Sequence, residues 1–163
     1  GTGDAILKCE KLIKSKYFLM LMPDDLIVKS NCSLELIKLH NKYKCSIIAS
    51  KRVSYKDVSR WGIFDIKKIN KKDFLIKDVI EKPKIKDTPS NYAVIGRYIL
   101  PSKIFSILKK QKPGQNGEIH VTDSIRELIH KKNKFIGHIF AGKYLDCGSM
   151  NGYVKSSLEI FKL

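Results

Sequence analysis

Two acidic positions far apart in the chain carry the side chains best suited to hold a divalent cation. Pro23, Asp24 and Asp25 end the apolar run Tyr17–Met22, and Asp146 lies in the short segment Tyr144–Gly148. Carboxylates at strand ends suit Mg²⁺, because this ion keeps several waters and takes its other ligands from substrate phosphates. If the two strand ends face each other, Asp24 and Asp146 would hold one ion between them. Each acid taken alone also suits a polar turn or a helix cap.

A second group of candidate residues is the tripeptide formed by Glu81, Lys82 and Pro83. The carboxylate can accept hydrogen bonds from hydroxyl groups, the ammonium can pair with a phosphate, and the proline restrains the local backbone. On spacing alone, a solvated ion pair on the surface is the simpler interpretation. Gly1 and Gly3 precede a helical pattern and would allow close approach to a flat or anionic ligand, although a capping turn explains them equally well.

The elements that must position these residues alternate between strands and helices. The uninterrupted apolar run at 17–22 predicts a strand buried on both faces. Further strand-like runs occur at 45–49, 62–66, 74–80, 92–100 and 135–140, and helical spacing of apolar residues occurs at 31–43, 123–131 and 153–161. This alternation predicts an α/β fold with a largely parallel sheet, helices on both faces, and ligands beyond the carboxyl ends of the strands.

Charge is the most conspicuous property of the composition. The chain has 32 Lys and Arg residues against 16 Asp and Glu residues, a formal net charge of +16, which would attract nucleic acids and anionic membranes. However, the excess is almost entirely lysine and is scattered, whereas base and phosphate recognition favours arginine. We therefore interpret it as a solvated surface that helps to gather nucleotides, and expect no nucleic-acid partner.

The cysteines and the apolar segments bear on the cellular environment. The four cysteines show no metal-ligand spacing, and no apolar run approaches the roughly 20 residues of a membrane span. We expect reduced thiols, a cytoplasmic location and no membrane association.

Seven short motifs follow one another along the chain. They are G-T-G-D-A at 1–5, L-M-P-D-D at 21–25, V-S-R-W-G-I at 58–63, E-K-P at 81–83, P-S-N-Y-A-V-I-G-R-Y at 89–98, G-E-I-H-V-T-D at 117–123 and D-C-G at 146–148. In this order they resemble the motifs of bacterial UTP–glucose-1-phosphate uridylyltransferases, members of the sugar-nucleotide pyrophosphorylase superfamily. Trp61 stands where the family pattern has tyrosine, and His120 where it has glutamine.

The resemblance implies a Rossmann-like nucleotidyltransferase with a mixed, mostly parallel central sheet that is incomplete at the N-terminus. The family's phosphate loop would precede Gly1, so residues 1–163 would be a partial domain, the latter half of the family domain. The implied activity is Mg²⁺-dependent transfer of uridylyl from UTP to glucose 1-phosphate, which gives UDP-glucose and pyrophosphate. The implied protein partner is a second copy in a homo-oligomer or a complementing N-terminal chain.

Residue roles also follow from the resemblance. Asp24 and Lys82 would be the catalytic residues: Asp24 would hold Mg²⁺ with Asp146 as the second carboxylate, and Lys82 would neutralise the sugar phosphate. Glu81 would accept hydrogen bonds from glucose hydroxyls. Backbone contacts would come from four glycines, with Gly62 and Gly96 at the sugar and Gly1 and Gly3 against uracil.

Other functions fit the same residues. A related thymidylyltransferase differs only in base choice, which depends partly on sequence outside this chain. A non-catalytic remnant or subunit would keep the sugar-phosphate side of the pocket, and we expect the chain alone to be inactive without the N-terminal half. A basic nucleic-acid binder would instead show salt-sensitive duplex binding.

Overall fold

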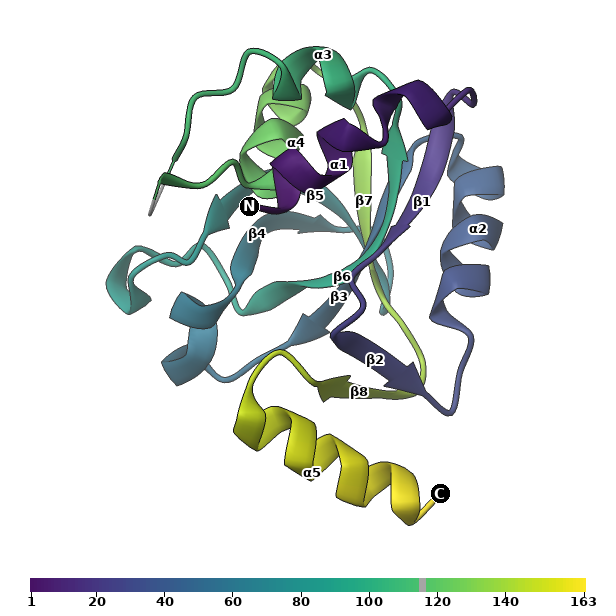
Figure 1. The fold of residues 1–163 in the computed structure, drawn as a ribbon, viewed down its shortest axis with the longest axis vertical. Coiled ribbons are helices and arrows are strands. Elements are labelled where there is room, and N and C mark those ends of the chain that lie inside the picture. The colour runs from purple at the N-terminus through teal and green to yellow at the C-terminus, as the bar shows by residue number, and fades with distance from the viewer. Residues whose placement is uncertain (115–116) are drawn as a thin grey trace.

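A six-stranded sheet forms the centre of the molecule in the computed structural model, which describes residues 1–114 and 117–163 (Figure 1). The strand order is β1-β6-β3-β7-β5-β4. A smaller sheet pairs β2 with β8, one beside the other below the main sheet in Figure 1. The strands are β1 (Tyr17–Leu21), β2 (Asp25–Val28), β3 (Ser46–Arg52), β4 (Gly62–Lys68), β5 (Asp73–Glu81), β6 (Tyr92–Pro101), β7 (Phe135–Ile139) and β8 (Lys143–Asp146).

Helices cover both faces of the main sheet, as the sequence predicts. The helices α1, α3 and α4 contribute to one core cluster and α2 contributes to the other, while α5 lies beside the small sheet (Figure 1). Their bounds are α1 (Thr2–Lys8), α2 (Cys32–Tyr43), α3 (Ile104–Leu108), α4 (Val121–His130) and α5 (Met150–Phe161). Short 3₁₀ helices span Glu10–Leu12 (η1), Tyr55–Arg60 (η2) and Ile85–Asp87 (η3).

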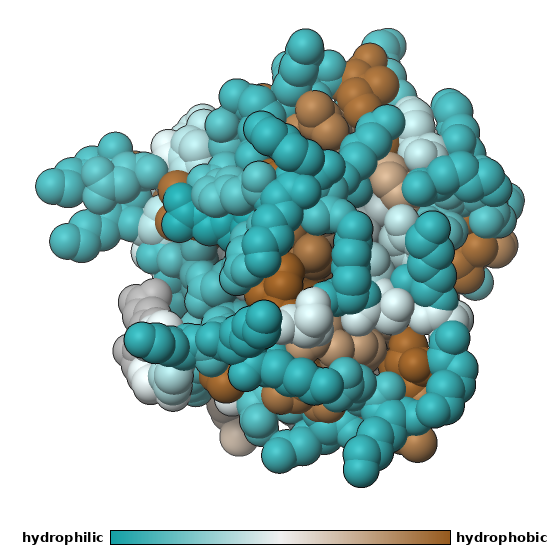
Figure 2. Space-filling model, turned by 90° about the horizontal axis from the view of Figure 1, so that it is seen from above, coloured by the Kyte–Doolittle hydropathy of each residue, from teal (hydrophilic) through white to brown (hydrophobic). Residues whose placement is uncertain are grey.

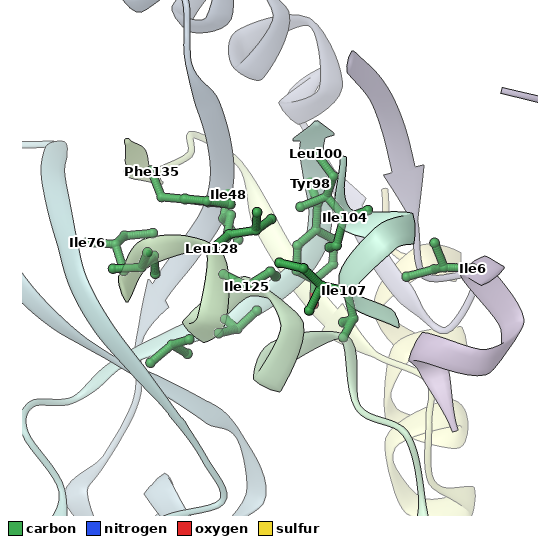
Figure 3. Close-up of a cluster of buried hydrophobic side chains, with 14 of the residues drawn as sticks. Ile6, Ile48, Ile76, Tyr98, Leu100, Ile104, Ile107, Ile125, Leu128 and Phe135 are labelled. Atoms are coloured by element: carbon green, nitrogen blue, oxygen red, sulfur yellow. The ribbon is translucent and has the colours of Figure 1, made fainter. Parts of the chain in front are cut away.

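In the larger core cluster, three helices pack against the sheet. Figure 3 shows Ile6 of α1, Ile104 of α3 and Leu128 of α4 with strand residues such as Ile48 and Tyr98. On the opposite face Leu36 of α2 packs among buried isoleucines and other apolar residues of β3, β6 and β7. Each fully buried aliphatic side chain of this kind contributes about 1.5–3 kcal/mol, so these two layers hold the scaffold beneath the candidate site.

The prediction of a mostly parallel sheet is wrong. Among the strand pairs of the described ranges, β3–β7 is parallel, whereas β1–β6, β3–β6, β4–β5, β4–β6 and β5–β7 are antiparallel. Helices cover both faces, so an antiparallel strand such as β6 is as continuously apolar as a parallel one. Continuous apolarity therefore carries no information about strand direction.

The strand at 17–22 also differs from its prediction of burial on both faces. It is β1, the outer strand of the sheet, and Leu19 and Leu21 are 36% and 50% exposed. An apolar run at an open sheet edge has the same sequence pattern as a central strand. The edge beside β1 is consequently an apolar surface.

Figure 2 shows one face on which hydrophilic side chains surround small, separate apolar areas. None of the helices in the described part of the chain has the length and apolarity needed to cross a membrane.

Candidate active site

A pocket of about 230 Å³ lies at one end of the main sheet. Asp24 follows β1, Gly62 begins β4, Glu81 ends β5 and Lys82 follows it, so four of the predicted site residues share this pocket. The other walls come from the starts of α1 and α4 and from β6. The lining residues are Thr2, Met22, Asp24, Asp25, Arg60, Trp61, Gly62, Glu81, Lys82, Val94, Tyr98, Glu118, His120, Val121 and Thr122.

The structure brings Asp24 and Asp146 together across Gly148. A Cβ placed on Gly148 would lie 2.8 Å from Asp24 Oδ2 and 3.3 Å from Asp146 Oδ1. The backbone holds this arrangement: Asp25 pairs with Asp146 in the β2–β8 ladder, and the Cys147 N–H donates to the Asp24 carbonyl at 2.8 Å. The two strand ends meet through the small sheet rather than as neighbours in one parallel sheet.

The two carboxylates fit a hard divalent cation. Asp24 is exposed, and Asp146 is half-buried with its Oδ1 accepting the Gly148 N–H at 3.0 Å. Within residues 1–114 and 117–163, no group of three or more His, Cys, Asp or Glu side chains is arranged to hold a metal. Two carboxylates with an open side are what Mg²⁺ uses when substrate phosphates and water supply its other ligands.

Asp25 has a different role from its neighbour, and its position in the chain suggested only a turn or capping residue. Its Oδ2 accepts the Gly96 N–H at 2.5 Å, and its Oδ1 accepts the Tyr144 hydroxyl hydrogen. Burial raises the pKa of the Asp25 carboxyl; these two hydrogen bonds oppose the rise, and the negative charges of Asp24 and Asp146 add to it. Both oxygens of Asp25 are engaged, so it fixes the acidic turn against β6.

Glu81, Lys82 and Gly62 form the opposite wall. Gly62 and Glu81 are paired in the β4–β5 ladder, and a Cβ on Gly62 would lie 3.2 Å from Glu81 Oε2 and 3.0 Å from Val94 Cγ2. Lys82 has a left-handed backbone (φ 45°), and its N–H donates to the Trp61 carbonyl at 3.0 Å. The Glu81 carboxylate and the Lys82 ammonium at this end of the hairpin therefore line the same pocket.

The remaining predicted glycines do not line this pocket. Gly96 is buried in β6, where a Cβ would lie 2.5 Å from Asp25 Oδ2, so its lack of a side chain admits the acidic turn. Gly1 caps α1 and Gly3 lies inside it, and a Cβ on either would lie within 3 Å of the Ile119 carbonyl oxygen. Thr2, between them, does reach the pocket.

Arg60 is a candidate site residue that the spacing of acids and glycines did not reveal. Its Nη2 donates to Asp146 Oδ2 at 3.1 Å, and its guanidinium lies 5.8 Å from the centre of the Trp61 ring. Arg60 lines this pocket and also two adjoining hollows of about 550 Å³ and 310 Å³. One available signal was its type, because the chain has only four arginines among 32 basic residues.

Comparison with known proteins identifies the family of this chain. The family model described as "Nucleotidyl transferase" matches residues 1–162, and the chain belongs to this family. A crystal structure of a UDP-glucose pyrophosphorylase complexed with UDP-glucose is 42% identical, with a TM-score of 0.93 over 99% of this chain. A UTP-bound UGPase from Acinetobacter baumannii is 30% identical, with a TM-score of 0.83 over 98% of this chain.

Sequence comparison finds relatives in the same family. The UTP–glucose-1-phosphate uridylyltransferase of Pseudomonas aeruginosa is 34% identical over 160 residues, which are 96% of this chain. The resemblance carried by the seven motifs is thereby confirmed. The chain spans 57% of that relative's length, and 62% and 56% of the two crystallised chains. It therefore corresponds to part of the enzyme in these relatives.

Proposed function

We propose that this chain forms the sugar-phosphate and cation side of a UTP–glucose-1-phosphate uridylyltransferase, which makes UDP-glucose and pyrophosphate. The observation that carries the proposal is the convergence of Asp24, Glu81 and Lys82 on one pocket, with Asp146 at its border. The names of the relatives, which include a structure with UDP-glucose and one with UTP, support this choice of ligands.

The acidic side of the pocket would serve the triphosphate. Asp24 and Asp146 would hold Mg²⁺, which when bound supplies positive charge to phosphate oxygens. Asp25, hydrogen-bonded to Gly96 and Tyr144, keeps the turn that bears Asp24 in one conformation. A fixed turn matters because catalysis of phosphoryl-type transfer is mostly positioning and charge neutralisation.

The opposite wall would hold the acceptor. The Lys82 ammonium would pair with the phosphate of glucose 1-phosphate, and Glu81 would accept hydrogen bonds from sugar hydroxyls. The buried Gly62 leaves room for the sugar beside the Glu81 carboxylate. A phosphate oxygen of glucose 1-phosphate then attacks the α-phosphorus of UTP in line, a new P–O bond forms, and the bond to the departing pyrophosphate breaks.

Completion of the active site would require a further part of the nucleotidyltransferase domain. The open edge of β1 is the candidate contact, because Leu19 and Leu21 are exposed there together with Leu34 and Ile37 of α2. The His40 ring of α2 lies 4.5 Å from the Tyr17 ring, which places this side of α2 next to β1. An apolar edge strand of this kind accepts another strand readily.

Calorimetry with glucose 1-phosphate and UDP-glucose tests the proposal. We expect Lys82→Ala to weaken binding of both at least tenfold, because it removes a charge-assisted contact. Lys84→Ala is the matched control: it removes the same charge from an exposed position in the next turn and should leave binding unchanged. Equal losses in the two variants would mean that only net charge matters, and would contradict the proposed pocket.

Turnover separates the remaining alternatives. Pyrophosphate release by this chain is expected only after addition of a complementing N-terminal chain, and Leu19→Glu should abolish that gain without changing UDP-glucose binding. Binding that remains without turnover under all conditions would favour a non-catalytic subunit. Tighter binding of dTDP-glucose than of UDP-glucose would favour a thymidylyltransferase.

A further inference from the structure

Arg60 competes for the carboxylate that the cation would need. Its Nη2 is 3.1 Å from Asp146 Oδ2, on the carboxylate whose other oxygen lies close to Asp24 across Gly148. The Arg60 side chain is 56% exposed and the Asp146 side chain 28% exposed, so the pair is accessible to solvent. Arg60 lines the pocket, and both residues line the two adjoining hollows. A guanidinium stays charged at all working pH values. It would therefore repel a divalent cation bound at Asp146.

Comparison with a second arginine shows that Arg60 uses only part of its guanidinium to contact its carboxylate. Arg126 holds Asp78 with two nitrogens, Nε to Oδ1 and Nη2 to Oδ2, each at 3.0 Å. Arg60 holds Asp146 with one nitrogen, and it also lines the two adjoining hollows. A one-nitrogen contact at an exposed position is weak and can be exchanged at small cost. The planar fork of arginine is well suited to phosphate oxygens once it leaves Asp146.

We propose that Arg60 couples cation binding to anion binding: it pairs with Asp146 when the site has no cation, and turns to the ligand's phosphate groups when a divalent cation takes Asp146. This inference rests on the proposed function, because it takes Asp24 and Asp146 as the cation ligands. It gives Arg60 two successive partners within reach of the same pocket. The cation alone should then bind weakly, and cation and phosphate ligand should strengthen each other's binding.

Electron paramagnetic resonance titration with Mn²⁺, in the absence and presence of UDP-glucose, tests this coupling. In the unmodified chain, UDP-glucose should raise the affinity for Mn²⁺ at least tenfold. In Arg60→Ala, Mn²⁺ alone should bind about threefold more tightly, and the enhancement by UDP-glucose should fall at least fivefold. Because coupling is reciprocal, calorimetry should show the same reduced factor when Mn²⁺ is added to UDP-glucose.

Arg126→Ala is the matched control, since it removes the same charge from a pair between α4 and β5 outside the pocket. Its Mn²⁺ affinity should stay within about twofold of the unmodified chain, and both variants should melt within about 4 °C of it. Identical behaviour of the two variants, or weaker Mn²⁺ binding by Arg60→Ala alone, would overturn the coupling. If Asp24→Asn and Asp146→Asn leave Mn²⁺ binding unchanged, the proposed cation site fails and the coupling fails with it.

Discussion

Two clusters of charged side chains in this molecule contain similar residue types but differ in their exposure to solvent. In the first, His138 lies between two carboxylates, with Nδ1 2.6 Å from Asp73 Oδ1 and Nε2 3.2 Å from Glu35 Oε2. In the second, Arg60 pairs with Asp146, and Asp146 and Asp24 both lie close to Gly148. The first cluster is enclosed by α2, β5 and β7, and the second is open to solvent.

Burial and hydrogen bonding account for the difference. His138 and Asp73 are each 6% exposed, and Asp73 Oδ2 accepts further hydrogen bonds from Asn70 at 2.8 Å and Tyr43 at 3.3 Å. Glu35 also accepts the Ala141 N–H at 3.0 Å. The carboxylate oxygens of Asp73 and Glu35 accept hydrogen bonds from the protein. Asp24, by contrast, is exposed and lies near Asp146 beside Gly148. A satisfied charge cluster holds elements together, and an open one has capacity for a ligand.

The largest effect on stability should come from removing the histidine of the enclosed cluster. We expect His138→Ala to lower the free energy of unfolding by about 3–5 kcal/mol, because Asp73 stays buried without its partner. Urea unfolding measures the loss. His130→Ala is the control: its side chain is 58% exposed beside Asp78, so its loss should be below about 1 kcal/mol. Equal losses of unfolding free energy in the two variants would show that His138 stabilises the fold no more than an exposed histidine does.

The open cluster should respond in the opposite way. Asp24→Asn should weaken Mn²⁺ binding at least tenfold, about 1.4 kcal/mol, and change the free energy of unfolding by less than about 0.5 kcal/mol. Paramagnetic resonance titration and urea unfolding of the same samples measure both quantities. Asp87→Asn, an exposed acid of η3, should change neither. A large stability loss in Asp24→Asn would place Asp24 with the structural acids.

Local patterns predicted much of the site, whereas contacts across long sequence separations escaped prediction. The Glu81-Lys82-Pro83 tripeptide and the acids after the apolar run at 17–22 are short-range patterns, and the pocket does contain Asp24, Glu81 and Lys82. Arg60 meets Asp146 across 86 residues, and His138 meets Glu35 across 103. Such pairings depend on strand order and register, which hydrophobic periodicity does not specify.

The errors in the fold prediction have the same origin. Apolar runs do not encode strand direction, so β6 could be recognised as buried without its antiparallel direction. The four-residue strands β2 and β8 carry too short a pattern to be seen, yet their pairing sets Asp25 opposite Asp146. Gly96 illustrates the limit for single residues: its contact with the acidic turn was not predicted, and its contact with sugar stays a prediction.

Acid should destabilise the enclosed cluster of Glu35, Asp73 and His138. Burial would raise the pKa of Glu35 and Asp73, but the Ala141 N–H and His138 lower that of Glu35, and Asn70, His138 and Tyr43 lower that of Asp73. Because both folded pKa values lie below the usual 4.5 and 3.8, the two carboxylates stabilise the fold above those values. That contribution is lost as the pH falls from about 5 through the folded pKa values.

Urea unfolding between pH 3 and pH 7 should therefore show a decline in stability below about pH 5. Its size should be smaller than the His138→Ala effect, because protonated carboxyl groups keep part of their hydrogen bonding. Glu35→Gln, which cannot ionise, should make the decline shallower. A profile for Glu35→Gln parallel to that of the unmodified chain would assign the acid sensitivity to other carboxylates.

The smallest effect should come from an exposed ion pair that belongs to neither cluster. Lys131 Nζ lies 2.5 Å from Glu127 Oε1 at the end of α4, and the two side chains are 61% and 47% exposed. Solvent screens this contact, so a double-mutant cycle of Lys131→Ala and Glu127→Ala should give a coupling of about 0.3–0.5 kcal/mol. A coupling above about 1 kcal/mol would show that proximity of opposite charges is itself stabilising here. The contrast between the clusters would then reflect distance rather than enclosure by the surrounding elements.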